Sequence, residues 1–499
     1  AMPTRVSMTP ADSGTYRVGA LVNGLPVSPE ETNVAVIPVP EFPSRLYVAP
    51  GGFGGGCSDG DSWENALPEL QEAMQRARVS NGATTEIWVA AGTYNPGAAP
   101  LGTFEVIHGV KMYGGFAGNE TDPAQRDIDS NATILSGASG VGNNIHVMVC
   151  PGGSPGLDGF TIRDGLANGF QFESTGAGLH ILAGTPRLSR CKFFNNAGRF
   201  GSGAIHVPRN EGVELFDCVF DGNSAPESVG GAIRCAGTID AVNCVFQNNS
   251  AKVGGALFFG SGARQSTFVN CLFVRNQSSN NGGNALRITG GSRIKVDLIN
   301  CTVTLNDTVA SGFGAIFVDD DAGLNVYNTI IWDNDNESVE DDQILDGGGI
   351  VMVSHSIISG LASYNGNNNS GEDPLFVDAM SDFHLTSNSP AKNSGDNTLL
   401  PSGTDSDLDG GPRVISGTVD RGAYEFVPVQ PGDCDRDGDV DMRDVALFDA
   451  CANGPEMPID SSCIDKDFDE DGDIDQSDFG VLQRCISGEN LPGDPSCAD

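Results

Sequence analysis

The sequence predicts an all-β chain wound into a parallel β-helix, and two phrases that repeat along its middle support this fold class. The first phrase reads Cys, any residue, an apolar residue, two further residues and Asn. Its complete copies begin 27, 26, 27 and 30 residues apart, at Cys191, Cys218, Cys244, Cys271 and Cys301. The second phrase, Gly-Ala followed by Ile or Leu, recurs out of phase with the first. A period in the twenties of residues with short apolar alternations indicates a solenoid.

The spacing within the first phrase predicts which side chains face the core. Residues two apart on a strand point to the same face, so each coil is expected to send its Cys and its apolar residue inward. Consecutive coils stack about 4.8 Å apart, which predicts continuous columns of Cys and of Phe along the axis. That spacing exceeds the roughly 3.8 Å between the Cβ atoms of a disulfide, so the column cysteines are interpreted as buried thiols.

The Asn of each phrase predicts a third column. Its members are Asn196, Asn223, Asn249, Asn276, Asn306 and Asn334, with Gly165 at the matching place of an earlier copy. Asn and Gly both tolerate the left-handed conformation, so this position is expected to adopt it at a coil corner. Stacked amides are also expected to hydrogen-bond from coil to coil.

Composition narrows the function classes. The net charge of −39 argues against nucleic acid as a partner, because nucleic-acid binding needs a basic surface. An apolar run of 18 residues is absent from the sequence, so no membrane span is expected. Five of the 13 cysteines lie in the last 66 residues, which predicts local disulfides in an oxidising compartment.

Two features precede the coils. Residues 1–40 contain Asp12-Ser-Gly-Thr-Tyr16, which resembles the corner tyrosine phrase of an immunoglobulin-like domain, although only two or three strands are present. We interpret this segment as a partial Ig-like unit; an unrelated leader strand pair is the alternative. Further on, an amphipathic helix is expected around Leu70–Met74, capped by Asp61 or Ser62, to cover the open end of the first coil.

Several phrases outside the repeats carry a family resemblance. They are Ser62-Trp-Glu-Asn-Ala66, Ile87-Trp-Val-Ala-Ala-Gly-Thr-Tyr94, Tyr113-Gly-Gly-Phe-Ala-Gly-Asn-Glu-Thr121 and Asp420-Arg-Gly-Ala-Tyr-Glu-Phe426. Over residues 44–427 the chain resembles secreted bacterial right-handed parallel β-helix repeat proteins. The resemblance implies a right-handed coil and a secreted or cell-surface location. It leaves activity open, because that superfamily mixes polysaccharide lyases and hydrolases with non-enzymatic surface and adhesive proteins.

The tail, residues 432–499, carries two calcium-loop phrases 34 residues apart. An EF-hand-type loop takes oxygen ligands from positions 1, 3, 5, 7, 9 and 12, with Gly at position 6, and Ca²⁺ prefers six to eight oxygens. The predicted ligands are Asp433, Asp435, Asp437, Asp439, Asp441 and Asp444 in the first loop, and Asp467, Asp469, Asp471, Asp473, Asp475 and Asp478 in the second. The expected cofactor is Ca²⁺.

Each calcium loop leads into one short helix, and this pairing resembles the type I dockerin domain. The resemblance implies calcium binding and a protein partner, either cohesin-like or a second copy through self-association. Dockerins that bind cohesins often carry Ser or Thr at loop positions 10 and 11. Those positions are Met442-Arg443 and Gln476-Ser477 here, so the partner stays open between the two alternatives.

A candidate ligand strip follows the Gly-Ala phrase. The residues after the inward Ile or Leu are His180, His206, Arg234, Phe258, Arg287 and Phe317. Alternation places them on the outer face of one sheet. Aromatic faces and Arg forks suit sugar rings and uronate carboxylates. Ordinary outward strand residues are the alternative.

These observations predict a secreted structural or adhesive β-helix protein that docks through its calcium-binding tail. The alternatives are a polysaccharide lyase or glycoside hydrolase, and a carbohydrate-binding scaffold. Either one would use the sheet face around His180, His206 and Arg234. No catalytic residue is assigned, so enzymatic activity is left open and is the less favoured interpretation.

Overall fold

The computed structural model describes most of the chain beyond residue 41. The described residues are 42–51, 58–139, 142–169, 174–280, 282–306, 314–334, 343–360, 366–427, 431–435, 439–455, 457–460, 463, 466–469, 471–488, 491 and 497, with the backbone of four short strands before them. The chain divides into two units, Ala1–Pro43 and Ser44–Asp499.

The first unit contributes two small antiparallel pairs. β1 (Ser7–Pro10) pairs with β2 (Tyr16–Gly19), and β3 (Leu21–Val22) pairs with β4 (Leu25–Pro26). Residues 11–15, which include most of the predicted corner phrase, lie outside the described residues. The Ig-like interpretation therefore stays a prediction.

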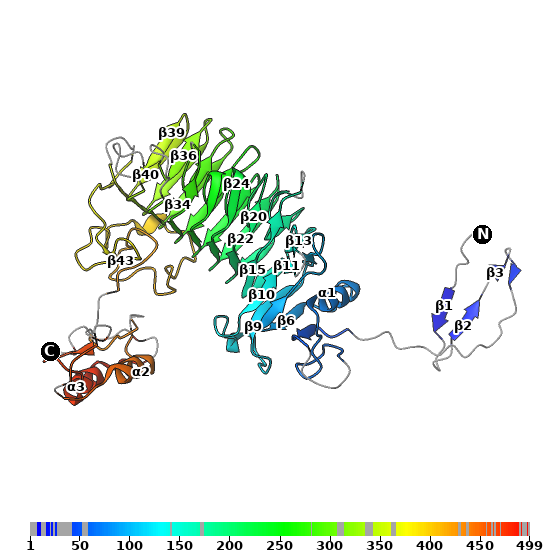
Figure 1. The fold of residues 1–499 in the computed structure, drawn as a ribbon, viewed down its shortest axis with the longest axis horizontal. Helices are drawn as coiled ribbons and strands as arrows, with labels where there is room; N and C mark the ends of the chain where they lie inside the picture. Colours follow the sequence, from blue (N-terminus) through cyan, green and yellow to red (C-terminus); the bar gives the residue numbers. More distant parts are fainter. Residues whose placement is uncertain are drawn as a thin grey trace. The chain divides into compact units, whose positions relative to one another are not determined.

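The second unit contains a right-handed parallel β-solenoid whose coils pass through four sheets in turn (Figure 1). We number the sheets in the order in which a coil visits them. Within each sheet, every strand pairs in parallel with its counterpart one coil later. The repeat period read from the sequence is therefore one turn of the coil.

The strands of the four sheets are as follows. The first sheet contains β8 (Phe104–Glu105), β13 (Met148–Cys150), β17 (Leu179–Ile181), β21 (Ile205–Val207), β25 (Ile233–Cys235), β29 (Leu257–Phe259), β33 (Leu286–Ile288), β36 (Ile316–Asp319) and β39 (Ile344–Gly347). The second contains β5 (Arg45–Val48), β6 (Glu86–Ala90), β9 (Lys111–Phe116), β14 (Gly156–Asp158), β18 (Arg187–Ser189), β22 (Gly212–Phe216), β26 (Thr238–Val242), β30 (Ser266–Val269), β34 (Lys295–Ile299), β37 (Gly323–Tyr327) and β40 (Ile350–Ser354). The third contains β7 (Gly92–Tyr94), β10 (Thr133–Ser136), β15 (Phe160–Arg163), β19 (Lys192–Phe194), β23 (Val219–Asp221), β27 (Val245–Gln247), β31 (Leu272–Val274), β35 (Thr302–Thr304), β38 (Ile330–Trp332) and β41 (Ile357–Ile358). The short fourth sheet contains β16 (Leu166–Ala167), β20 (Ala197–Gly198), β24 (Ser224–Val229), β28 (Ser250–Val253) and β32 (Gln277–Ser278), and β11 (Ala138–Ser139) pairs with β12 (Gly142–Asn143) outside these sheets.

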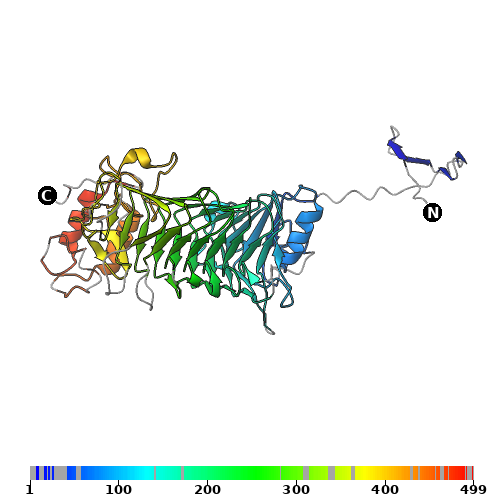
Figure 2. The same cartoon turned by 90° about the horizontal axis from the view of Figure 1, so that it is seen from above.

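The predicted inward columns are confirmed. The rings of Phe193, Phe220, Phe246 and Phe273 stack at centroid distances of 5.0, 4.9 and 4.8 Å and lie within 7° of parallel. The column cysteines are fully buried and carry free thiols, as expected from the coil spacing. The strands that carry these columns lie side by side along the solenoid in Figure 2. The core is therefore a set of stacks of like residues.

The Asn column forms a continuous ladder of side-chain amides. Each Nδ2 donates to the Oδ1 of the next member, with distances from 2.9 to 3.1 Å between Asn196 and Asn334. One expectation was wrong, because the left-handed residue is the one before each ladder Asn. The φ values are 52° at Asn195, 54° at Asn248 and 53° at Arg275. The turn directs the following Asn inward, where coil-to-coil hydrogen bonds satisfy its buried amide.

Helix α1 (Leu70–Val79) covers the first coil, as predicted. It buries Leu70, Ala73, Met74 and Ala77 in the same core cluster as the strands. The predicted cap was wrong: the N-cap residue is Glu69, which makes no side-chain capping bond. The Asp61 side chain instead accepts hydrogen bonds from Ser62 and Asn65 within its own turn.

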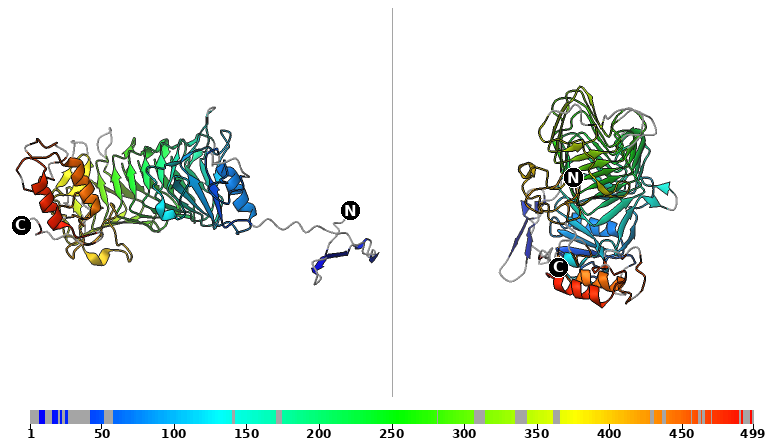
Figure 3. Two further views of the ribbon diagram at one scale, coloured as in Figure 1. Left: turned by 90° about the horizontal axis from the view of Figure 1, so that it is seen from below. Right: turned by 90° about the vertical axis from the view of Figure 1, so that its left-hand side faces the viewer.

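Residues 366–427 form a return segment that runs back beside the coils after β41, coloured yellow to gold in Figure 3. The segment contains the antiparallel pair β42 (Phe376–Asp378) and β43 (Asp382–Leu385) and a 3₁₀ helix, η3 (Asn397–Leu399). Corner residues between the second and third sheets hold it in place. Asn270 Nδ2 donates to the carbonyl of Ser406 at 2.7 Å, and Asn300 Nδ2 donates to that of Asp420 at 2.9 Å. Another 3₁₀ helix, η1 (Pro123–Gln125), lies near the first coils.

A buried ion pair stabilises the return segment from within. Arg413 Nη2 lies 3.1 Å from Glu425 Oε2, and both side chains are about 1% exposed. Arg413 also donates to the carbonyls of Asp420 and Ala423. Burial raises the pKa of Glu425 to about 8, although Arg413 opposes this shift. Glu425, which belongs to the Asp420–Phe426 resemblance phrase, thus has a structural role here.

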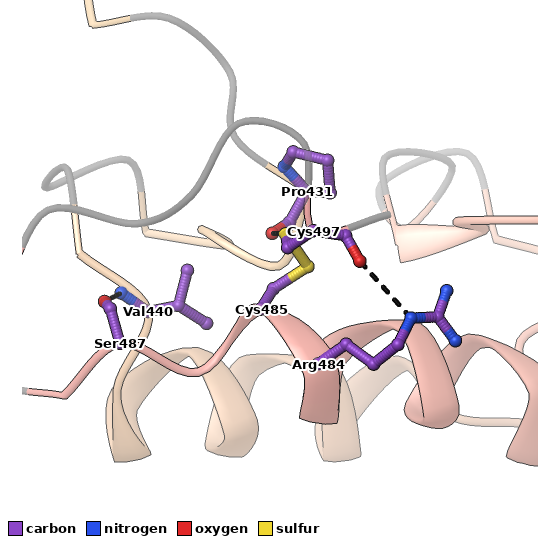
Figure 4. The surroundings of a disulfide bond; sticks show 6 residues. All are labelled: Pro431, Val440, Arg484, Cys485, Ser487 and Cys497. Atoms are coloured by element: carbon purple, nitrogen blue, oxygen red, sulfur yellow. Dashed lines mark hydrogen bonds between the residues drawn. A yellow bond between two sulfur atoms is a disulfide. The ribbon is translucent and has the colours of Figure 1, made fainter. Parts of the chain in front are cut away.

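The tail contains α2 (Met442–Cys451) and α3 (Gln476–Cys485), which pack around Val440, Phe448, Ile474 and Leu482. Two local disulfides, Cys451–Cys463 and Cys485–Cys497, tie each helix to the chain 12 residues later, as the clustering of cysteines predicted. Figure 4 shows the second of them. Among the residues that the structure describes, no helix has the length and apolarity needed to cross a membrane.

Candidate metal centre and ligand column

The predicted calcium ligands converge in the tail. Asp437 lies outside the described residues, and the other eleven fall into four groups whose ligand oxygens lie within 4.8 Å of one another. The groups are Asp433 with Asp435 and Asp444, Asp439 with Asp441 and Asp444, Asp467 with Asp469 and Asp471, and Asp473 with Asp475 and Asp478. Within the described ranges, these are also the only such groups of potential metal ligands.

Helix capping positions the carboxylates of each loop. Asp441 is the N-cap of α2 and accepts from the Arg443 amide at 2.7 Å, and Asp475 occupies the same position on α3. The last ligand of the first loop, Asp444, is buried. Its Oδ2 accepts from the Asp441 amide at 2.7 Å, and its Oδ1 accepts from the Cys434 amide at 2.6 Å. One carboxylate therefore joins the start of the loop to the first turn of the helix.

The donor set of each loop fits Ca²⁺. Every grouped atom is a carboxylate oxygen, the ligand type that this hard cation prefers. Desolvation and the neighbouring carboxylates of Asp478 and Asp471 raise the pKa of Asp469, because each carboxylate opposes the charge of the others. A divalent cation would offset this repulsion.

The two loops are coupled through their eighth positions. Val440 and Ile474 are fully buried in the common core. The Val440 amide donates to Ser487 Oγ at 2.9 Å (Figure 4), and the Ile474 amide donates to Asn453 Oδ1 at 3.0 Å. Each loop thus pairs with the residues that follow the other repeat's helix. These two hydrogen bonds could not be predicted from the loop phrases, because Asn453 and Ser487 lie outside both of them.

The structure places the predicted ligand strip in one register on the first sheet. Successive members face each other across β17, β21, β25, β29, β33 and β36, in the order His180, His206, Arg234, Phe258, Arg287 and Phe317. Sequence reasoning missed His146, whose ring stacks on that of His180 at 4.7 Å although Val149 is the residue in register with His180. His146 escaped detection because it lies just before β13 and outside the Gly-Ala phrase.

The members of this column differ in their surroundings. His180 is buried, and its Nδ1 lies 3.2 Å from the Thr175 carbonyl. Burial lowers the pKa of His180, and burial with the nearby His180 and Arg234 lowers that of His206 to about 3. Both imidazoles are therefore neutral at neutral pH, and His206 is a weak proton acceptor.

The two arginines of the column are also unlike each other. Arg287 forms an ion pair with Asp319, and its guanidinium lies 3.8 Å from the centre of the Phe317 ring. Arg234 is half-buried, and among the described residues it has no hydrogen-bonding or ion-pair partner. Burial lowers the pKa of Arg234 from its ordinary value. Only Arg234 therefore presents an uncompensated cation along this column.

Two family models match parts of the chain. Residues 143–303 match the family model described as a right handed beta helix region, and residues 431–487 match the dockerin type I domain. No curated protein matches the chain. Among solved structures, the crystal structure of pectate lyase Pel9A is similar with 15% sequence identity and a TM-score of 0.41, over 76% of this chain and 96% of that chain. The chain is a right-handed parallel β-helix protein with a C-terminal type I dockerin domain.

Proposed function

We propose that this protein is an extracellular structural or adhesive module of a bacterium, and that its calcium-loaded tail docks the solenoid to a protein partner. The observation that carries the proposal is the pair of coupled carboxylate loops, each built onto the first turn of a short helix. Dockerin type I domains bind calcium and cohesin partners. Docking through the tail leaves the solenoid available as a long, rigid spacer.

The exposed faces of the two tail helices suggest where the partner binds. Helix α2 exposes Met442 and Leu447, whereas the equivalent positions of α3 hold the exposed Gln476 and the buried Val481. These two exposed apolar side chains distinguish α2 from α3. We therefore place the partner on α2, and the occupant that we favour is a cohesin-like protein that contacts Met442 and Leu447.

Titration of a panel of cohesin domains against the whole chain tests this docking. We expect binding in the presence of calcium, and loss of binding in EDTA or after substitution of both Asp444 and Asp478 by Ala. The variant Asp405→Ala is the matched control, because Asp405 is exposed, lies outside the tail and belongs to no carboxylate group. Calcium-dependent self-association in analytical ultracentrifugation, without cohesin binding, would favour a second copy as partner. A chain that stays monomeric and binds no cohesin would contradict docking.

A glycan-binding role for the column on the first sheet is a second candidate. Arg234 favours it, because this half-buried guanidinium has no partner among the described residues and lies between His206 and Phe258. An Arg fork beside an aromatic ring suits the carboxylate and the ring of a uronate. The low pKa of His206 makes binding a better fit than acid–base catalysis at this site.

Arg234→Ala should therefore weaken binding of an oligogalacturonate by about tenfold or more, because it removes a charge-assisted contact. Arg287→Ala should change this affinity much less, since Arg287 is already paired with Asp319. Isothermal titration calorimetry on the whole chain measures both variants. Equal affinities for the wild type and Arg234→Ala would end this candidate.

A further inference from the structure

A polar hollow lies where the last coil meets the return segment. Its volume is 560 Å³, and its lining includes His355, Asn368, Asn393, Asp396, Thr418 and Arg421. The volume falls within the range of about 300–1,000 Å³ that is usual for small-molecule sites. Unlike most such sites, it is lined by amides, a hydroxyl, an imidazole and a carboxylate. Its chemistry therefore suits a ligand rich in hydroxyl groups.

The position of His355 in the solenoid shows that it differs from its counterparts. It continues a corner column of left-handed residues, Asn243, Asn270, Asn300 and Asn328, whose φ values are 53°, 52°, 50° and 48°, and its own φ is 52°. The return segment occupies the side chains of the earlier members. Asn300 Nδ2 donates to the Asp420 carbonyl, and Asn328 Nδ2 donates to the Asp396 carbonyl. His355 lines the hollow, and its ring is held between Ser354 Oγ, 2.9 Å from Nδ1, and Asn368 Nδ2, 2.8 Å from Nε2.

The acceptor across the hollow from His355 is Asp396. Its Oδ1 caps η3 by accepting from the amide and the hydroxyl of Thr398, at 2.9 and 2.7 Å. These bonds hold the pKa of Asp396 below its ordinary value, so the group is ionised. The other oxygen, Oδ2, lies 3.9 Å from His355 Nε2, too far for a direct hydrogen bond. Asp396 Oδ2 has no hydrogen-bonding partner among the described residues and is open to a ligand hydroxyl, whereas His355 Nε2 is already paired with Asn368 Nδ2.

The other charged group at the hollow is Arg421. Arg421 is buried and donates to the main-chain carbonyls of Ser394 and Asn368, at 3.0 and 2.9 Å. Its guanidinium thereby joins the return segment to the last coil and stabilises both walls. The guanidinium keeps its positive charge and the ionised Asp396 balances it, so the hollow has no net charge from these two groups to attract a carboxylate-bearing sugar.

We propose that this hollow binds a neutral saccharide unit, whose hydroxyl groups contact Asp396 Oδ2 and the amide of Asn368, with His355 orienting that amide. The recognition uses hydrogen bonds to a carboxylate and an amide, both of which can pair with hydroxyl groups. The site is separate from the tail and from the Arg234 column, so it stands independently of the docking proposal.

Calorimetry of the whole chain in calcium buffer, with neutral trisaccharides of glucose, mannose, galactose and xylose as probes, tests the proposal. At least one probe should bind with a Kd of about 1 mM or tighter. His355→Asn and Asp396→Asn should each weaken that binding by about tenfold or more. Both variants preserve the backbone: Asn occupies the left-handed position in four earlier coils, and Asn caps a helix nearly as well as Asp.

The matched control is Asp122→Asn, because Asp122 caps η1 in the same way that Asp396 caps η3, away from the hollow. This control should leave both affinity and melting temperature unchanged. Binding of none of the neutral probes would overturn the proposal. So would binding of trigalacturonate alone, or equal affinity in the wild type and both hollow variants. Cohesin titration of the same variants separates these outcomes from any failure of docking.

Discussion

Removal of calcium is expected to unfold the tail while the solenoid stays intact. Helices α2 and α3 contribute 10 residues each, and α1 in the solenoid contributes 10 more, so EDTA should abolish about two-thirds of the α-helical signal of the described residues. The physical reason is repulsion between carboxylates. Two of them 4.8 Å apart repel by ~1 kcal/mol in water and by ~3 kcal/mol at an effective dielectric constant of 20. Circular dichroism during a chelator titration measures the change.

Variants of single residues test whether the two calcium loops are coupled. Asp478→Ala should remove calcium from the second loop and also weaken the first, because each loop pairs with the residues after the other helix. Asp449→Ala, on the exposed face of α2, is the control and should behave as the wild type. An unchanged helical signal after complete chelation would contradict a calcium-dependent fold for the tail. Independent titration of the two loops would contradict their coupling.

Substitution of one ladder amide is expected to have the largest effect on the solenoid. Asn249→Leu keeps the branching of the side chain but leaves buried groups without partners. These are the amide and Nδ2 of Asn223, which donate to Asn249 Oδ1 at 3.0 Å, and the Phe220 carbonyl, which accepts from Asn249 Nδ2 at 2.9 Å. At ~1–3 kcal/mol for each such group, the free energy of unfolding should fall by about 3–9 kcal/mol. Chemical denaturation of the solenoid measures this loss.

The matched control for the ladder is Gln247→Ala on the same coil. Gln247 points outward and donates only to Asp221 at 3.0 Å, so its loss should cost less than about 1 kcal/mol. Similar losses in the two variants would mean that the amide ladder is not what specifies the stacking. A selective loss in Asn249→Leu would show that buried polar groups, as well as the Phe stack, set the register of the coils.

The columns were predictable because a solenoid repeats its contacts. Once Cys218 and Phe220 recur 26 residues later as Cys244 and Phe246, every coil offers the same environment to the same residue type. The period therefore specifies the register without knowledge of distant contacts. The sequence did not predict which corner residue adopts the left-handed backbone conformation. The left-handed residue precedes Asn249 rather than coinciding with it, because the turn at Asn248 needs a positive φ to direct Asn249 inward.

The sequence predicted which residues of the ligand column lie beside one another, but not which other side chains they contact. Alternation along each strand gave the facing of Arg234 and Arg287 correctly. It carried no information about partners that come from other parts of the chain, such as Asp319 beside Arg287. The hollow around His355 was invisible for the same reason, since Asp396 and Arg421 reach it only through the return segment.

The sequence by itself determined the coil period, the identity of the stacked residues and the grouping of the carboxylates in the two acidic loops, because each of these depends on residues close together in the chain or repeated at fixed intervals. The tertiary structure alone decided that residues 366–427 run back along the corner Asn residues, that Val440 and Ile474 couple the two loops, and that His355 and Asp396 share a hollow. These contacts join residues with no common period, so only the closed fold brings them together.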